Sequence, residues 1–230
     1  MEEIIEVPNS LFDFDSVADR YDRWCQTPAG RMYDRLEKTA MARFLPPSRG
    51  KRLLEVGCGT GHWSEFFASL GFEVFGVDIS SEMIRRAESR YGRRCRFTVA
   101  DAYRLPHEDE SFDLVAAVTV LEFAGNPAAV IREMFRCLRS GGRAIVAVLN
   151  RLAPINCRRV AKGRQPYASA KLLSPDELRS LLEPFGRVRM LVAGFVPERK
   201  YLIGLAPMIE KLSLALRRQK GALIVAEVKT

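Results

Sequence analysis

Histidine and paired cysteine, the side chains from which zinc sites are most often built, are scarce in this sequence. There are two histidines, His62 and His107, and they form no HExxH pattern. The five cysteines are odd in number, lie far apart and include no CxxC pair. This spacing argues against a zinc site and against a disulfide framework. We therefore expect no bound metal.

Long apolar runs are also missing. No segment offers the roughly 20 uninterrupted apolar residues that a membrane-spanning helix requires. The first residues, Met1–Glu3, are acidic and lack the charged-then-apolar pattern of a signal peptide. We therefore expect a cytoplasmic protein. The length of 230 residues, 47% of them hydrophobic, fits a single α/β domain over 1–230.

Glycine, by contrast, is concentrated in a stretch around which the chain is organised. The apolar run Leu53–Val56 contains a carboxylate, Glu55, and Gly57, Gly59 and Gly61 follow it at alternate positions before a helical pattern begins. Glycines let the backbone turn sharply and let a ligand approach closely. The N–H groups at the start of a helix then face that ligand. The pattern predicts a ligand cradle between a strand and a helix.

The next two strand patterns each end at an acid. Asp78 closes the stretch 71–80 and lies 21 residues after Gly57, about where a nucleotide-binding unit places the carboxylate that binds ribose hydroxyls. Asp101 closes the stretch 95–102. A nicotinamide dehydrogenase has a similar sheet, but its GxGxxG fingerprint spaces the glycines differently and does not require Asp101. We therefore set that alternative aside.

Five short stretches, taken in order, resemble the motifs of one family. They are Glu-Val-Gly-Cys-Gly-Thr-Gly at 55–61, Val-Asp-Ile-Ser at 77–80, Asp-Ala at 101–102, Ser-Phe-Asp-Leu-Val at 111–115 and Leu-Arg-Ser-Gly-Gly at 138–142. Together they resemble the class I S-adenosylmethionine-dependent methyltransferases. The branch that looks most similar is type 11, which includes ubiquinone and menaquinone biosynthesis enzymes. The resemblance covers roughly residues 14–150 and, more loosely, the last third.

The resemblance implies S-adenosylmethionine as the cofactor and S-adenosylhomocysteine as its product. It implies that the glycine loop packs against the methionine part and the ribose, that Asp78 accepts from the ribose hydroxyls, and that Asp101 receives the adenine amino group. The expected cofactor-binding residues are Glu55, Gly57, Cys58, Gly59, Gly61, Asp78, Ile79, Met83, Asp101, Ala102 and Val118. The motifs do not identify the methyl acceptor.

Strand and helix patterns alternate along the chain, which predicts a parallel sheet with helices on both faces. The expected strands are 52–56, 73–77, 95–99, 112–118, 143–149, 188–196 and 221–228. The expected helices are 61–70, 81–90, 126–139 and 174–183, with Gly141 and Gly142 ending the third of them. The resemblance implies that the last strand inserts antiparallel between the fifth and sixth. The expected fold class is therefore α/β, a Rossmann-like doubly wound sheet of seven strands.

Two extra helices are expected before the first strand, in a cap over 1–47. Apolar spacing predicts one over 14–24, a break at 27–30, and a second helix over about 31–44. Similar family members use such a segment to cover the cofactor and shape the acceptor pocket. The substrate-side candidates are Tyr21, Trp24, Arg31 and Tyr33. The alternative, which stays open, is that the aromatic residues of the first helix only pack it against the domain.

The sequence fixes no catalytic residue. A methyl sulfonium is already activated, so the protein mainly has to align the acceptor with it. A base is needed only if the acceptor must lose a proton. Glu122, after the fourth strand pattern, is a weak candidate for that base, and it fits equally well as a structural carboxylate.

The excess of eight positive charges arises in two segments. Residues 151–172 carry six basic side chains and no acid, and residues 199–220 carry six against the single acid Glu210. We expect 151–172 and 198–220 to be insertions on the acceptor side, where their field would attract an anionic acceptor. Contact with nucleic acid or anionic lipid, and simple solvation of the charges, are the alternatives.

The segment 199–220 is also rich in apolar residues. An apolar segment with basic ends fits a lid over a lipophilic acceptor, a dimer contact, an interfacial membrane helix or simple packing on the core. The apolar residues that share one helical face are Leu205, Met208, Ile209, Leu212 and Leu216.

The whole sequence predicts an S-adenosylmethionine-dependent methyltransferase for a small molecule of anionic or lipophilic character, as a monomer or homodimer. An RNA methyltransferase is the enzymatic alternative. Against it, we find no appended RNA-binding domain and no aromatic–basic stacking motif, so we do not expect a nucleic-acid partner. A protein that binds the cofactor without acceptor chemistry is the non-enzymatic alternative. We expect no membrane span and at most weak association with a membrane surface.

Overall fold

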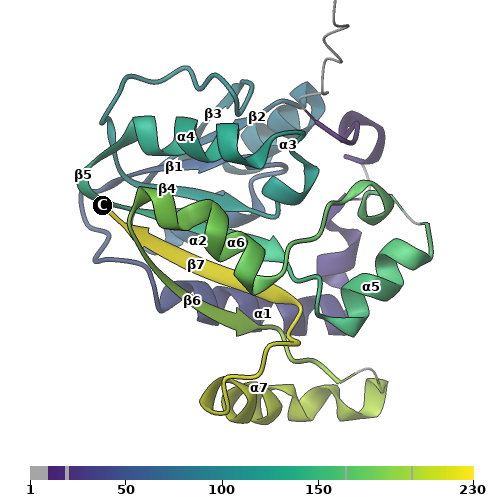
Figure 1. Cartoon of the computed structure of the whole chain (residues 1–230). Coiled ribbons are helices and arrows are strands. Elements are labelled where there is room, and N and C mark those ends of the chain that lie inside the picture. The colour runs from purple at the N-terminus through teal and green to yellow at the C-terminus, as the bar shows by residue number, and fades with distance from the viewer. Residues whose placement is uncertain (1–9, 19–20, 164, 198) are drawn as a thin grey trace, which may run out of the picture.

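A sheet of seven strands crosses the middle of the molecule (Figure 1). The computed structural model describes residues 10–18, 21–163, 165–197 and 199–230. The strands lie in the order β3-β2-β1-β4-β5-β7-β6. Their bounds are β1 (Arg52–Val56), β2 (Glu73–Asp78), β3 (Cys95–Val99), β4 (Phe112–Val118), β5 (Leu138–Leu149), β6 (Arg187–Ala193) and β7 (Leu223–Lys229).

Among the described strands of the sheet, only the last one, β7, is antiparallel to the others. β7 pairs antiparallel with β5 and with β6, whereas β3, β2, β1, β4 and β5 pair in parallel. The expected fold class and the expected insertion of the last strand are thus confirmed. The chain reverses its direction of winding between β1 and β4, and a crevice at the carboxyl ends of the strands is characteristic of such a reversal.

Helices cover both faces of the sheet (Figure 1). Ile131 and Met134 of α4 and Leu178 of α6 are buried in one apolar cluster, and Met41 of α1 and Phe67 of α2 in another. The α-helices are α1 (Pro28–Ala42), α2 (His62–Ser69), α3 (Ser81–Tyr91), α4 (Pro127–Cys137), α5 (Pro154–Ala161), α6 (Pro175–Leu182) and α7 (Ala206–Ala215). The 3-10 segments are η1 (Asp15–Val17), η2 (Tyr21–Gln26), η3 (Leu121–Phe123), η4 (Tyr167–Ser169), η5 (Glu183–Phe185) and η6 (Lys200–Leu205). No described helix is long and apolar enough to cross a membrane.

The N-terminal region differs from its expected helices. The predicted helix over 14–24 was wrong, because the described residues there form η1 and η2 instead. Thr27, expected within a break, begins α1: its hydroxyl oxygen accepts the N–H of Gly30 at 3.0 Å, and Pro28 takes the first helical position. The acids Asp15 and Asp22 bond to other parts of the chain, so contacts distant in sequence set the path of this region.

The fifth strand also starts earlier than expected. α4 ends at Cys137, and Leu138 already has an extended backbone and pairs with Phe112 of β4. Gly141 and Gly142 therefore lie inside β5, next to an irregular register, and the prediction that they end a helix was wrong. α5 was not predicted.

Candidate functional site

Three glycines in the loop between β1 and α2 have a left-handed backbone. Gly57, Gly59 and Gly61 have φ values of +70°, +51° and +82°. A Cβ on Gly57 would lie 2.3 Å from Cγ2 of Val120, so a side chain cannot fit there without a shift. A Cβ on Gly59 would meet no described atom within 4 Å. The loop therefore turns away from the core at Gly57 and presents bare backbone to open space at Gly59.

Two adjoining pockets open where the strands end. The first has an empty volume of about 720 Å³ and extends over the ends of β2 and β3. The second has an empty volume of about 1430 Å³ and lies between the glycine loop, η2, α1 and α5. The residues that line both pockets are Gly57, Gly59, Val118, Thr119 and Phe123. The two pockets therefore share one floor, formed by the ends of β1 and β4.

The floor contains a residue in an unusual backbone conformation. Thr119 follows β4 directly and has a φ of +54°, which is rare for a residue with a branched side chain. Its N–H donates to the carbonyl of Ala147 at 2.8 Å, so β5 holds this turn in place. Such conformations persist where the surrounding structure fixes them, and they cluster at functional sites.

The acid at the end of β2 is tied to the loop in the first pocket. Oδ2 of Asp78 accepts the N–H of Gly59 at 2.8 Å, and Oδ1 accepts the N–H of Ser80 at 2.9 Å. Burial raises the pKa of Asp78, although these two backbone hydrogen bonds oppose the shift. Backbone N–H groups thus hold this carboxylate at the edge of the first pocket, where its oxygens can also accept from a ligand.

The wall of the first pocket carries both apolar and acidic side chains. Met83 is buried, whereas Ile79 is half exposed at 47% of its surface. Oδ1 of Asp101 accepts the N–H of Tyr103 at 2.9 Å, and Ala102 lies between the two. A flat ligand in this pocket would thus contact apolar side chains along its faces and a carboxylate at its edge.

Residues near the N-terminus cover the first pocket. Ser10 and Phe14 line it, and the N–H of Leu11 donates to the carbonyl of Phe123 at 2.8 Å. The rings of Phe14 and Phe123 lie edge to face with centroids 5.1 Å apart. Oδ1 of Asp15 accepts the hydroxyl of Ser80 at 2.5 Å and the N–H of Glu82 at 3.0 Å. These contacts hold the segment across the pocket and against the start of α3.

The second pocket contains two aspartates that already have cationic partners. Asp22 accepts the hydroxyl of Thr60 at 2.7 Å and pairs with Arg90. Oδ1 of Asp34 lies 2.6 Å from Nε2 of His62, and Nζ of Lys38 lies 3.0 Å from Asp34 and 3.0 Å from the same His62 nitrogen. Burial would raise the pKa of Asp34, but these hydrogen bonds outweigh it and leave the pKa lowered. The negative charges of Asp22 and Asp34 are therefore balanced by the positive charges of Arg90 and Lys38.

Two glutamates of the second pocket have raised pKa values, in contrast to the lowered pKa of Asp34. Glu55 is buried at the end of β1, and its Oε2 accepts the hydroxyl of Ser64 in α2 at 2.5 Å. Burial raises the pKa of Glu55 to about 8. Burial also raises the pKa of Glu37 to about 7, and the nearby charge of Arg159 opposes this shift. Near neutral pH the Glu55 carboxyl is thus mostly protonated, whereas Glu37 is present in both its protonated and its ionised form.

Arg159 of α5 enters the second pocket among aromatic rings. The carbon of its guanidinium lies 4.9 Å from the ring centre of Trp24, 4.9 Å from that of Tyr167 and 5.8 Å from that of Tyr33. Its Nη1 donates to Oδ1 of Asn156 at 3.3 Å, and no described carboxylate lies at ion-pair distance from it. Aromatic faces hold a guanidinium flat and leave its N–H edges available.

Most of the expected residues line the two pockets. Those in the first pocket are Gly57, Gly59, Asp78, Ile79, Met83, Asp101, Ala102 and Val118. Those in the second are Trp24, Tyr33, Glu55, Gly57, Cys58, Gly59 and Val118. The structure thus brings together residues that lie up to 94 positions apart along the chain, Trp24 and Val118 among them.

Three expected residues lie outside the two pockets, and the side chain of a fourth is not described. Gly61 caps the start of α2 and lines neither pocket. Arg31 is exposed and donates to the carbonyl of Gln26. Glu122 lies outside both pockets, with Oε1 accepting the N–H of Leu149 at 3.0 Å. The side chain of Tyr21 lies outside the described part of the structure.

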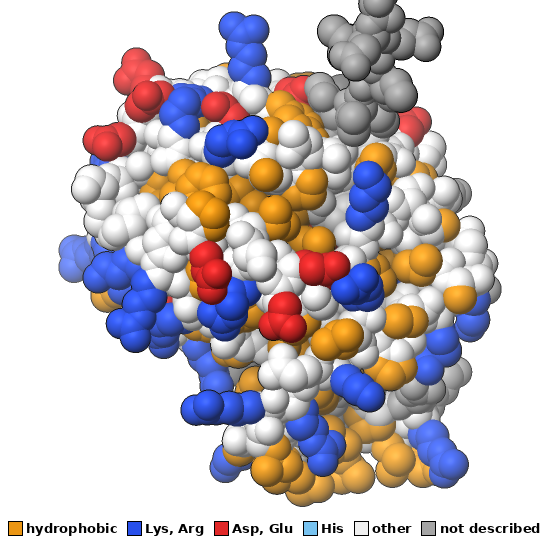
Figure 2. Space-filling model, in the orientation of Figure 1, with side chains coloured by type: hydrophobic (Ala, Val, Ile, Leu, Met, Phe, Trp, Pro, Cys, Tyr) orange, Lys and Arg blue, Asp and Glu red, His pale blue; other side chains and the backbone are white. Residues whose placement is uncertain are grey.

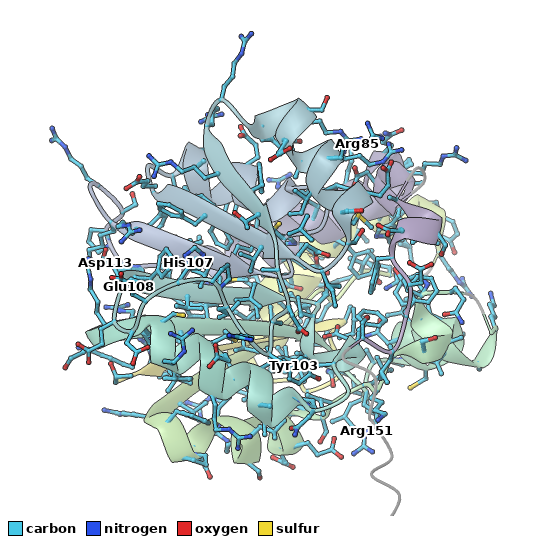
Figure 3. The ribbon with its side chains drawn as sticks, turned by 90° about the horizontal axis from the view of Figure 1, so that it is seen from above. Arg85, Tyr103, His107, Glu108, Asp113 and Arg151 are labelled. Atoms are coloured by element: carbon cyan, nitrogen blue, oxygen red, sulfur yellow. The ribbon has the colours of Figure 1, made fainter. Side chains whose placement is uncertain are left out.

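Other pocket residues were not named as site candidates. Asp34 and Glu37 of α1 reach the second pocket, and only the position of Asp34 beside Tyr33 hinted at one of them. Arg159 of α5 and Tyr167 of η4 also reach it, and both belong to the segment 151–172 that was expected on the acceptor side. His62 follows the glycine loop directly, and this position was a signal that the sequence interpretation did not use. The other histidine is remote: Figure 3 shows His107, with Glu108 and Asp113, well away from Tyr103 of the first pocket.

Comparisons with known proteins agree with this geometry. The family model described as a methyltransferase domain matches residues 54–146. An uncharacterised protein of Methanocaldococcus jannaschii is 34% identical over 75% of this chain and 80% of its own length. A ubiquinone biosynthesis O-methyltransferase of Caulobacter sp. is 35% identical over 64% of this chain and 66% of its own length.

The fold comparison agrees as well. A crystal structure from Thermotoga maritima, described as an S-adenosylmethionine-dependent methyltransferase and possible histamine N-methyltransferase, superposes with a TM-score of 0.72. That likeness covers 94% of this chain and 97% of the other at 24% identity, so it concerns the fold. The motifs in the glycine loop, the sheet order and these relatives lead to one assignment: the chain is an S-adenosylmethionine-dependent methyltransferase of class I, in the type 11 branch.

Proposed function

We propose that this enzyme binds S-adenosylmethionine in the first pocket and methylates a small molecule held in the second. The observation that supports this division is the shared floor at Gly57, Gly59 and Thr119, where the two pockets meet. A cofactor that lies along the floor would direct its reactive end toward the second pocket. The aromatic walls of that pocket fit a small acceptor rather than a macromolecule.

The residues present fit the cofactor. Gly59 offers the open approach that a Cβ would fill, and Asp78 has lone pairs for the ribose hydroxyls. Ile79 and Met83 would contact the adenine ring, and Asp101 its amino group. The remaining expected residues, Glu55, Cys58, Ala102 and Val118, would line or order the same cradle.

The chain's contribution to the reaction is alignment. Bound S-adenosylmethionine supplies a methyl group already activated on a sulfonium. The second pocket would hold the acceptor atom in line with that methyl group, and positioning of this kind can contribute on the order of 7–11 kcal/mol. Trp24 and Tyr33 line the pocket from η2 and α1, where they would exclude water and fix the plane of the acceptor.

We assign an anionic group and a flat apolar body to the acceptor. Asp22 and Asp34 already have cationic partners, and the raised pKa of Glu37 leaves this acid only partly ionised near neutral pH. Among the described residues of the second pocket, Arg159 therefore carries a positive charge that no ion pair neutralises. A guanidinium suits a carboxylate or phosphate because it can donate two parallel hydrogen bonds. The name of the Caulobacter relative, a ubiquinone biosynthesis O-methyltransferase, is compatible with an aromatic hydroxy acceptor.

The two basic segments would then have different roles. Within 151–172, the pocket-lining residues are Arg159, Gln165, Pro166 and Tyr167, so this segment would be part of the acceptor site. The described residues of 198–220 line neither pocket. We propose one catalytic domain over 1–230, in which the N-terminal residues cap both pockets.

Calorimetric titration with S-adenosylmethionine tests the cofactor site. Asp78→Ala removes a charged acceptor, and the loss of such a hydrogen bond costs about 1.5–3 kcal/mol, or roughly ten- to 150-fold in affinity. Glu108→Ala is the matched control, because this exposed acid lies away from the pockets (Figure 3). Equal affinity of a folded Asp78→Ala protein and the wild type would refute the cofactor assignment.

Transfer of a radiolabelled methyl group tests the acceptor class. We expect turnover with aromatic hydroxy acids and little with their methyl esters, and Arg159→Gln should raise KM for the acids at least tenfold while leaving KM for the esters unchanged. Equal turnover of acids and esters by the wild type would refute the anionic group. Salt-sensitive labelling of RNA in place of small molecules would support the RNA alternative.

A further inference from the structure

Helix α7 exposes large apolar residues to solvent and buries polar ones against the rest of the protein. The face toward the sheet holds Ala206, Glu210 and Ser213, all buried. The face toward solvent holds Met208 and Leu212, which are 64% and 55% exposed. Surface helices of globular proteins normally bury their apolar stripe and expose the polar one. In α7 this arrangement is inverted.

The inversion is fixed by specific contacts. Oε1 of Glu210 accepts the N–H of Gly194 at 3.2 Å, and Oε2 accepts the N–H of Phe195 at 2.8 Å. These two backbone groups lie just after β6, so the buried carboxylate attaches α7 to the edge of the sheet. The apolar residues face outward because the opposite face is the one that is anchored.

The exposed apolar residues form a continuous patch, which we name the α7 patch. Its spacing of three and four residues places the helical members on one stripe. Its members are Tyr201, Leu205, Met208, Leu212 and Leu216, each 46% exposed or more. Figure 2 shows apolar side chains gathered at the end of the molecule where Figure 1 places α7. Patches of this kind on a soluble domain mark interaction sites.

Basic side chains surround the α7 patch. Lys211, Arg217, Arg218 and Lys220 are exposed, and none of them forms an ion pair with a described residue. Arg199, also exposed, donates to the hydroxyl of Tyr201 at 2.8 Å. Blue basic side chains flank the apolar surface at this end in Figure 2. The complementary partner is therefore apolar at its centre and negatively charged around it.

We propose that the α7 patch binds the surface of an anionic lipid bilayer. The apolar side chains would enter the boundary between headgroups and acyl chains while the basic side chains contact lipid phosphates. A second copy of this chain fits less well, because a two-fold contact would bring two basic rims together. The proposal concerns binding at the surface and does not depend on which acceptor is methylated.

Co-sedimentation with lipid vesicles tests the proposal. We expect the full-length protein to bind vesicles that contain 30% phosphatidylglycerol in phosphatidylcholine, to bind pure phosphatidylcholine far more weakly, and to dissociate in 0.5 M salt. Arg217→Gln/Arg218→Gln should weaken binding by about fivefold for each charge removed, the equivalent of about 1 kcal/mol per basic residue. Met208→Ser/Leu212→Ser should weaken it at least tenfold.

Two controls match these variants in chemistry. Leu70→Ser changes an exposed leucine at the end of α2, and Arg49→Gln/Arg93→Gln removes two exposed charges elsewhere on the surface. All variants should retain wild-type affinity for S-adenosylmethionine, because no changed residue lines a pocket. The proposal is overturned if the protein binds neither vesicle, or if the control variants lose binding as much as the α7 variants. It is also overturned if Met208→Ser/Leu212→Ser abolishes a concentration-dependent dimer while vesicle binding is absent.

Discussion

Nε2 of His62 lies 2.6 Å from Oδ1 of Asp34, across the gap between the start of α2 and the first half of α1. An ammonium can only donate, so Lys38 and His62 can both donate to Asp34, whereas His62 cannot donate through Nε2 and accept Lys38 there at once. The short distance to the carboxylate favours a proton on Nε2. With the proton on Nε2, Nδ1 is the hydrogen-bond acceptor of a ring that lines the pocket we assign to the acceptor.

The first prediction concerns this histidine as a proton acceptor. His62→Gln should lower kcat for a hydroxyl acceptor by about 10²–10⁴-fold. The affinity for S-adenosylmethionine should stay within a few-fold of the wild type. His107→Gln is the control, since that ring packs against Phe75 and Phe112 away from the pockets. An unchanged kcat in His62→Gln would exclude the role.

The second prediction separates two glycines of the loop. Gly59→Ala should fold, because its Cβ meets no described atom within 4 Å, but it should lose at least tenfold in cofactor affinity. Gly57→Ala should destabilise the fold by more than the 1–2 kcal/mol typical of a left-handed alanine, since its Cβ would lie 2.3 Å from Val120. Adding Val120→Ala should restore part of that loss.

Gly50→Ala provides the reference for both loop variants. Gly50 has a φ of +72°, and a Cβ there would meet no described atom within 4 Å. Gly50→Ala therefore measures only the free energy that a left-handed alanine backbone costs. Urea unfolding and calorimetry measure the two effects separately. If Gly59→Ala matched Gly50→Ala in both stability and affinity, the open space at Gly59 would not be the cofactor's place.

The third prediction concerns pH and Glu37. Because burial raises its pKa to about 7 from 4.5, the folded protein binds this proton more tightly than the unfolded chain does. The stabilisation is complete below about pH 4.5 and is lost as the pH rises through 7. Glu37→Gln, which stays neutral, should therefore lose less stability than the wild type between pH 5 and pH 8 in urea unfolding. Parallel curves for the two proteins would contradict the raised pKa.

The fourth prediction separates structure from catalysis at Glu122. Its Oε1 holds the N–H of Leu149, while its buried Oε2 has no described partner, and burial raises its pKa to about 7. Glu122→Gln keeps the acceptor for Leu149 and should keep kcat. Glu122→Ala should cost about 1–3 kcal/mol of stability, because it leaves that N–H unsatisfied. Loss of turnover in a stable Glu122→Gln protein would return Glu122 to the list of candidate bases.

The fold could be predicted where local patterns and tertiary contacts agree. The strands at 52–56, 95–99 and 112–118 have the predicted bounds, and Ser174 and Glu177 form the capping box that their spacing indicates. The segment 14–24 could not be predicted, because Asp15 bonds to the start of α3 and its apolar spacing alone looked helical. Such bonds between segments distant in sequence leave no periodic signal.

The residues of the candidate site also fall into two groups, those that the sequence predicts and those that only tertiary packing brings to the site. Residues on the glycine loop and at strand ends, such as Asp78 and Asp101, follow from motif spacing, because parallel strands end at one edge of the sheet. Arg159 and Tyr167 belong to a helix and a turn that the sequence interpretation did not resolve. Their approach to Trp24 depends on how α5 packs, which no local pattern encodes.

The aromatic wall of the second pocket also gives the protein a built-in optical signal. The chain has two tryptophans, Trp24 and Trp63, and both line this pocket. Intrinsic fluorescence excited at the red edge of protein absorption therefore comes from this one place in the molecule. Candidate acceptors can be screened for binding by quenching or spectral shift, without a label and without turnover, and Trp24→Phe identifies which indole responds.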